Sequence, residues 1–115
     1  MSNNYNAYTQ AMNFYRQGEY QKALNSLPAS NSDTASYYRG IFWLKLEEPA
    51  SAFRYLNPVK NQNNSAFQQK AEYYSAMALW KNGTKMEAKS AFEKITANQA
   101  HPFYDISVEI LASSF

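Results

Sequence analysis

The chain has 115 residues, with 11 basic and 9 acidic side chains, no cysteine and one histidine. This composition excludes disulfides, thiolate metal sites and cysteine nucleophiles, and one histidine leaves little basis for a metal site or a catalytic triad. A net charge of +2 gives no indication of nucleic-acid binding. We therefore expect one domain, over residues 1–115, that is not an enzyme, needs no cofactor and binds no metal or nucleic acid.

No segment approaches the roughly 20 apolar residues that span a bilayer. The longest apolar run, 41–44, ends at Lys45, and the polar N-terminal residues lack the regions of a signal peptide. We expect a soluble domain, cytoplasmic by default, without direct membrane insertion. Whether it belongs to a longer, membrane-anchored protein stays open.

Apolar residues recur at helical spacing along the chain, and no segment has the pattern of a strand. Turn residues separate the helical segments, with Pro49 suited to the first position of a helix and Pro58 close to the end of one. Ser32 or Asp33 is a candidate N-cap, and Ser65 with Gln68 predicts a capping box. The predicted helices cover residues 5–17, 20–27, 34–46, 49–57, 66–82, 85–97 and 101–113.

Three pairs of these helices share one pattern of residue sizes. A small residue in the first helix is followed three residues later by a large one, and after twelve residues by an alanine in the second helix. Another large apolar residue comes four positions after that alanine. The three sets are Ala11, Phe14, Ala23 and Leu27; Gly40, Trp43, Ala52 and Leu56; Ala76, Leu79, Ala88 and Phe92. Small residues let two helices approach closely, so the pattern predicts three helix hairpins.

This pattern resembles that of the tetratricopeptide repeat (TPR) family. Gly18 and Gly83 stand seven residues after the small position, where TPR hairpins often turn. The resemblance implies an all-α, right-handed α-solenoid of three hairpins with a C-terminal capping helix. The repeats would cover about 4–31, 32–60 and 65–97, and the capping helix about 101–113. The chain is most similar to short bacterial TPR modules, which often belong to membrane-anchored proteins.

In TPR proteins, one stripe of the first helices lines a concave surface. The matching positions, with the cation that follows each stripe, are Tyr8, Met12, Tyr15, Arg16, Tyr37, Ile41, Leu44, Lys45, Tyr73, Met77, Trp80 and Lys81. Aromatic side chains bury large areas with little loss of rotamer entropy, methionine adapts to a partner's shape, and cations favour an acidic ligand. We therefore expect a scaffold module that binds a protein, peptide or helix in an aromatic-lined groove.

Other interpretations stay open. The same tyrosines and methionines could pack between neighbouring hairpins, and the domain could be a structural or self-associating spacer of a larger protein, as a monomer or a weak homodimer. A small-ligand or glycan site is a third possibility.

His101 is expected at a helix start or on the surface, and Glu47 and Glu48 at a helix–helix turn. Lysines 81, 85, 89 and 94 are interleaved with Glu87 and Glu93, which is typical of a solvated face.

Overall fold

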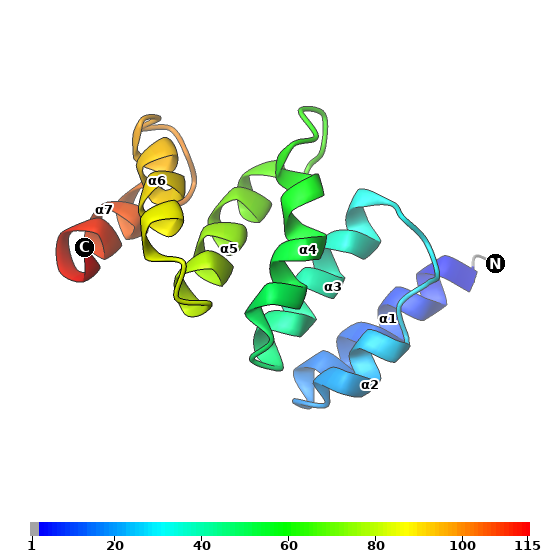
Figure 1. The fold of residues 1–115 in the computed structure, drawn as a ribbon. Helices are drawn as coiled ribbons and strands as arrows, with labels where there is room; N and C mark the ends of the chain where they lie inside the picture. Colours follow the sequence, from blue (N-terminus) through cyan, green and yellow to red (C-terminus); the bar gives the residue numbers. More distant parts are fainter. Residues whose placement is uncertain (1–2) are drawn as a thin grey trace.

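The structure, a computed structural model, describes residues 3–115, and these form seven α-helices and no strand. The helices are α1 (Asn3–Arg16), α2 (Tyr20–Asn25), α3 (Asp33–Lys45), α4 (Pro49–Lys60), α5 (Gln68–Lys81), α6 (Lys85–Thr96) and α7 (Tyr104–Ser114). The predicted all-α class is confirmed. Each helix packs against the next along the chain, and the row measures 46 × 28 × 20 Å, with α1 and α7 at its two ends (Figure 1).

The core consists of three apolar clusters, one for each of the pairs α1–α2, α3–α4 and α5–α6. The predicted small, alanine and second large positions are all buried: Ala11, Ala23 and Leu27; Gly40, Ala52 and Leu56; Ala76, Ala88 and Phe92. Each cluster also holds a buried residue from the first helix of the next unit, which is Phe42, Ala78 or Ile110. The same packing therefore recurs along the row and joins each pair to the next.

The close approach of α3 and α4 depends on a glycine. A Cβ atom added to Gly40 would lie 2.3 Å from Cγ of Leu56 and 2.6 Å from its Cδ2, far inside van der Waals contact. Leu56 is completely buried, so its side chain has no free space into which to move. The requirement for a small residue at this position, predicted from the spacing, is thus visible as a direct contact.

Helices α1, α3 and α5 end in the same type of turn. The residue seven positions after each small residue has a positive φ: +77° at Gly18, +59° at Glu47 and +82° at Gly83. The next amide donates to a carbonyl five residues earlier, in the pairs Glu19–Phe14, Glu48–Trp43 and Thr84–Leu79, which is the Schellman pattern. Glu47 is the one described non-glycine residue with a positive φ, so the second turn carries backbone strain.

Two predicted helix boundaries are wrong. Helix α4 does not stop near residue 57, because it continues through Pro58 to Lys60 and brings Val59 into the core with no exposed surface. Proline removes one hydrogen bond, and so close to the end of a helix the buried Val59 outweighs that loss. The last helix begins at Tyr104, since the residues expected to open it form a turn.

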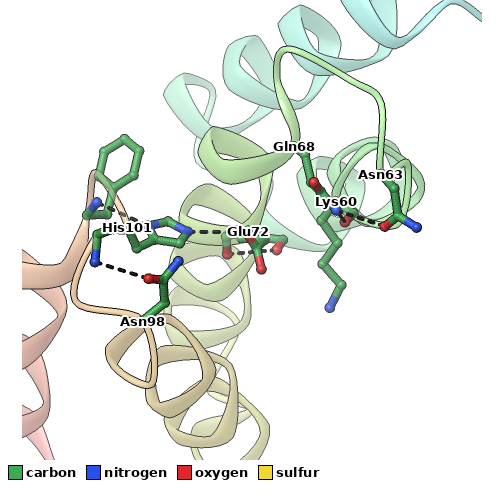
Figure 2. Close-up of polar contacts among 9 residues, drawn as sticks. Lys60, Asn63, Gln68, Glu72, Asn98 and His101 are labelled. Carbon is green, nitrogen blue, oxygen red and sulfur yellow. Dashed lines mark hydrogen bonds and ion pairs between the residues drawn. The ribbon is translucent and has the colours of Figure 1, made fainter.

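The predicted capping box at the start of the fifth helix does not form. Helix α5 begins at Gln68, and the Ser65 hydroxyl donates to Oδ2 of Asp33 at 2.5 Å while accepting from the Phe67 amide. The Gln68 amide group instead donates to the Lys60 carbonyl at 3.2 Å and to Oδ1 of Asn63 at 3.3 Å (Figure 2). The other cap is confirmed, because Ser32 Oγ accepts from the amide of Ala35 at the start of α3.

His101 is neither a surface residue nor part of a helix, contrary to expectation. It is 6% exposed, and its Nδ1 accepts a hydrogen bond from the Phe103 amide at 3.1 Å. Its Nε2 lies 3.1 Å from Oε1 of Glu72 on α5 (Figure 2). Because Nδ1 is an acceptor, Nε2 carries the hydrogen and donates to Glu72. Through these two hydrogen bonds, His101 connects the turn before α7 to α5.

Candidate functional site

A groove of about 390 Å³ runs across the first helices of the three pairs. We call it the α1–α3–α5 groove. Its lining residues are Met12 and Tyr15 of α1; Tyr37, Tyr38, Ile41, Phe42, Leu44 and Lys45 of α3; and Tyr74, Met77 and Lys81 of α5. Nine of these 11 side chains are aromatic or aliphatic and the other two are lysines, so the groove is apolar with a positive charge.

Eight of the twelve candidate binding residues line this groove, and they come from all three first helices. They are Met12, Tyr15, Tyr37, Ile41, Leu44, Lys45, Met77 and Lys81. The fold thus brings most of the stripe predicted from the TPR resemblance to one surface. Of these eight, Tyr37 is only 7% exposed, so it forms mainly the floor of the groove.

The other four candidates lie outside the groove. Tyr8 contacts the ring of Tyr38 at 6.2 Å between centroids, and Arg16 is exposed and donates to Oδ1 of Asn13. Tyr73 and Trp80 belong to α5, the last of the three first helices, and their stripe packs against the C-terminal end of the row. The ring of Tyr73, which is 9% exposed, stacks on Phe103 at 4.4 Å and 6°.

Trp80 is held in the same region, with its ring edge-on to Phe92 at 6.3 Å and tilted against Phe115 at 6.2 Å. The packing interpretation therefore describes Tyr73 and Trp80 better than the groove interpretation does. The difference arises because α6, the turn before α7 and the chain end cover this stripe on α5.

Sequence reasoning missed three lining residues, Tyr38, Phe42 and Tyr74. A signal for two of them was present: Tyr38 and Tyr74 each stand two residues before the small position, and each follows another tyrosine. The repeated Tyr-Tyr pair places one ring in the packing between helices and the next ring on the groove wall. Phe42 is completely buried in the first core cluster, so it lines the groove only from below.

The tyrosines of the groove form one connected cluster. The Tyr37 ring stacks on Phe67 at 4.7 Å and meets the rings of Tyr38 and Tyr74 edge-on at 5.3 and 6.4 Å. Burial raises the pKa of the Tyr37 hydroxyl, and the neighbouring tyrosines Tyr74, Tyr38 and Tyr15 raise it further. It is therefore neutral at physiological pH and available as a hydrogen-bond donor.

Within residues 3–115, no hydrogen bond involves the hydroxyls of Tyr37, Tyr38 or Tyr74. Aromatic rings with free hydroxyl groups offer both apolar contact area and hydrogen bonds to a ligand's backbone. The groove can therefore bind a ligand that combines apolar side chains with amide groups.

The charge of the groove is all of one sign. Lys45 and Lys81 stand in the last turns of α3 and α5 and are exposed, and no acidic side chain lines the groove. Neither lysine forms an ion pair with any residue that the structure describes. The end of the groove that holds Lys45 and Lys81 is thus complementary to an anionic group.

Over the described residues, no three histidine, aspartate or glutamate side chains lie close enough to hold a metal ion.

Within the described chain, none of the helices has both the length and the apolar character needed to cross a membrane. Comparison with known proteins finds no relative: no family model, no curated protein and no solved structure matches the chain.

Proposed function

We propose that the chain is a right-handed α-solenoid of three TPR-like hairpins, α1–α2, α3–α4 and α5–α6, capped by α7. We further propose that it is a non-catalytic scaffold module that binds a peptide or helical segment of a partner protein. The observation that carries this proposal is the α1–α3–α5 groove, whose lining comes only from the first helices and whose charged side chains are all positive.

The repeat assignment is supported by two features that recur three times. One is the buried set of small, alanine and large residues in each pair, and the other is the Schellman turn with positive φ seven residues after the small position. Recurrence of both core packing and backbone conformation is typical of repeat proteins, in which every unit contacts only its neighbours. Successive packing of the seven helices agrees with this arrangement.

The proposed partner segment has apolar side chains and an acidic residue. A volume of about 390 Å³ is near the lower limit of ligand-binding pockets, so the groove accommodates a few side chains rather than a whole helix. Met12 of α1 and Met77 of α5 line the groove as adaptable surfaces, and the tyrosine hydroxyls bind the segment's amides. The acidic residue lies beside Lys45 and Lys81.

A random peptide library displayed on phage tests this proposal. Selection on the wild-type protein is expected to enrich peptides that combine apolar and acidic residues. Their dissociation constants, measured by fluorescence anisotropy, should rise about tenfold in the Lys45→Glu/Lys81→Glu double variant, because reversing two exposed charges replaces attraction with repulsion. Both lysines are exposed, so the fold should be unaffected.

Lys89→Glu is the matched control, because Lys89 is an exposed lysine of α6 that lines neither the groove nor any other described pocket. It should leave the affinity unchanged at the same ionic strength. Failure to enrich any peptide, or equal loss of affinity in the control and the double variant, contradicts the proposed binding mode. Tyr37→Ala is unsuitable, since it removes a buried ring that stacks on Phe67.

A second candidate function is self-association through α7. Ile106, Val108 and Phe115 are 40%, 41% and 37% exposed at the C-terminal end of the row, and a second copy of the chain would cover this apolar surface. Sedimentation equilibrium of the wild type and of Val108→Glu distinguishes this role. A dimer that the substitution dissociates supports it, whereas a monomer at high concentration contradicts it.

A further inference from the structure

A second hollow lies between the second helices of neighbouring pairs, α4 and α6, with α5 as its floor. Its wider part, about 340 Å³, is lined by Phe53, Lys60, Leu79, Met86, Glu87, Ser90, Ala91 and Lys94. Its narrower part, about 130 Å³, is lined by Lys60, Asn61, Glu72, Ala91 and Lys94. Because three residues line both parts, we treat them as one α4–α6 furrow. None of its residues lines the α1–α3–α5 groove.

The wide part of the furrow combines apolar side chains with Glu87, and the narrow part holds two lysines and one glutamate. Phe53 and Leu79 are half-buried in the wide part, and Met86 is 86% exposed beside them. Lys60 and Lys94 approach each other from α4 and α6 in the narrow part. Met86 therefore leaves apolar surface accessible to a ligand in the wide part, close to the two cations.

Lys60 has no partner for its ammonium group. The side chain is half-buried, and neither it nor Lys94 forms an ion pair with another described residue. In Figure 2, the Lys60 carbonyl accepts from Gln68 while its ammonium group points away from the hydrogen-bonded residues. A partly desolvated charge without a partner is unfavourable, and an anion in the furrow would relieve it.

The charge at this end is positive although Glu72 lines it. Burial lowers the pKa of the Lys60 ammonium, the charge of Lys94 lowers it further, and Glu72 opposes them with a smaller effect. One oxygen of Glu72 already accepts the hydrogen bond from His101, which fixes the carboxylate on the floor of the furrow. The narrow part therefore holds two positive charges and one negative charge, which leaves it net positive.

We propose that the α4–α6 furrow is a second binding site, which holds a carboxylate side chain of a partner protein between Lys60 and Lys94 and an apolar side chain of the same segment against Phe53, Leu79 and Met86. This site is separate from the α1–α3–α5 groove, and the proposal does not depend on that groove. A partner could therefore contact the two surfaces from different segments.

Selective labelling of the methionine methyl groups with ¹³C gives one reporter in the furrow, Met86, and two in the groove, Met12 and Met77. Hexanoate serves as the first probe, because it combines an apolar chain with a carboxylate. At constant ionic strength, its addition should shift the Met86 signal in a saturable manner. The Lys60→Gln/Lys94→Gln variant should weaken this binding about fivefold or more, whereas Lys89→Gln should not.

Hexanol, which lacks the charge, is the chemical control and should give at most a small shift. An equal response to hexanol, or an unchanged affinity in the Lys60→Gln/Lys94→Gln variant, would overturn the proposed site. Far-UV circular dichroism of each variant checks that the fold is retained.

A peptide library selected on the Lys45→Glu/Lys81→Glu protein tests the partner assignment while the groove is disabled. Enriched acidic peptides should shift Met86 and leave Met12 and Met77 unchanged. If hexanoate binds but no such peptide does, the furrow is a site for free carboxylates and the partner assignment is wrong. Loss of peptide binding to the groove alone leaves this result unaffected, so the two proposals fail separately.

Discussion

Replacement of Gly40 by alanine tests the packing on which the second helix pair depends. The new Cβ would lie 2.3 Å from Cγ of Leu56, a branch point that cannot rotate away as the end of a flexible side chain would. Either α3 and α4 must separate or Leu56 must leave its rotamer. Because Leu56 has no exposed surface, both responses disturb the core cluster of the α3–α4 pair.

The expected cost follows from two opposing effects. Overpacking a well-packed core costs about 1–3 kcal/mol. Alanine is better than glycine in the interior of a helix by about 1 kcal/mol, which offsets part of that cost. A contact this short at a branch point corresponds to the upper half of the overpacking range, so we expect Gly40→Ala to lower the free energy of unfolding by about 1–2 kcal/mol.

Urea denaturation followed by circular dichroism measures this loss, and a double-mutant cycle identifies its cause. Leu56→Ala removes Cγ at a cost of about 2–5 kcal/mol. In that background, Gly40→Ala should no longer be destabilising and should gain up to about 1 kcal/mol from helix propensity. An equal loss in both backgrounds, or no loss in the wild type, would refute the close contact between Gly40 and Leu56.

Three other predictions concern stability. Glu47→Gly should raise the free energy of unfolding by about 0.5–1 kcal/mol, because glycine adopts the +59° φ without strain, whereas Gly83→Ala should lower it; thermal unfolding measures both, and opposite signs would contradict the turn assignment. The Ser65 hydroxyl and backbone hydrogen bonds lower the pKa of Asp33, so its stabilisation is present above about pH 4 and is lost as the pH falls through the folded-state value. The difference in urea midpoint between wild type and Ser65→Ala should therefore shrink as the pH is lowered, and a difference independent of pH would exclude this linkage. Ser107→Ala should leave stability equal or up to about 1 kcal/mol higher, because the Ser107 hydroxyl is buried without a hydrogen-bond partner; a loss above that size would show that the hydroxyl is satisfied.

The helices and their pairing were well predicted from the sequence, because the recurring pattern of small and large residues is a packing requirement. Ala11, Gly40 and Ala76 are buried where two helices meet, and the alanines and large residues that follow at fixed offsets are buried opposite them. Such residues are constrained by volume, and volume can be read from residue type. The turns at Gly18 and Gly83 were predictable for the same kind of reason, since glycine adopts a positive φ without strain.

Boundaries decided by long-range contacts were not predictable. Pro58 indicates a helix end, but burial of Val59 keeps it inside α4. Ser65 and Gln68 have the spacing of a capping box, but the Ser65 hydroxyl binds Asp33, which is 32 residues away along the chain. The isolated His101 gave no indication of its contact with Glu72, because that contact depends on how the last turn folds against α5.

The candidate site was predicted in its position but not in its extent. Repetition identifies a face of α1, α3 and α5, but it assumes that all three units have the same surroundings. The third unit differs, because the turn before α7 and the chain end bring Phe103 and Phe115 against the stripe on α5 that holds Tyr73 and Trp80. Residues at the end of a row therefore require the structure before a binding role can be assigned to them.

The most direct test of the central claim is a methyl NMR titration of the methionine-labelled protein with the tightest peptide selected on the wild type. If the α1–α3–α5 groove binds the peptide, the Met12 and Met77 signals should shift with one shared dissociation constant, since both line that groove. The shifts should be lost in Lys45→Glu/Lys81→Glu and kept in Lys89→Glu. Unchanged Met12 and Met77 signals at a peptide concentration that saturates binding would contradict the claim.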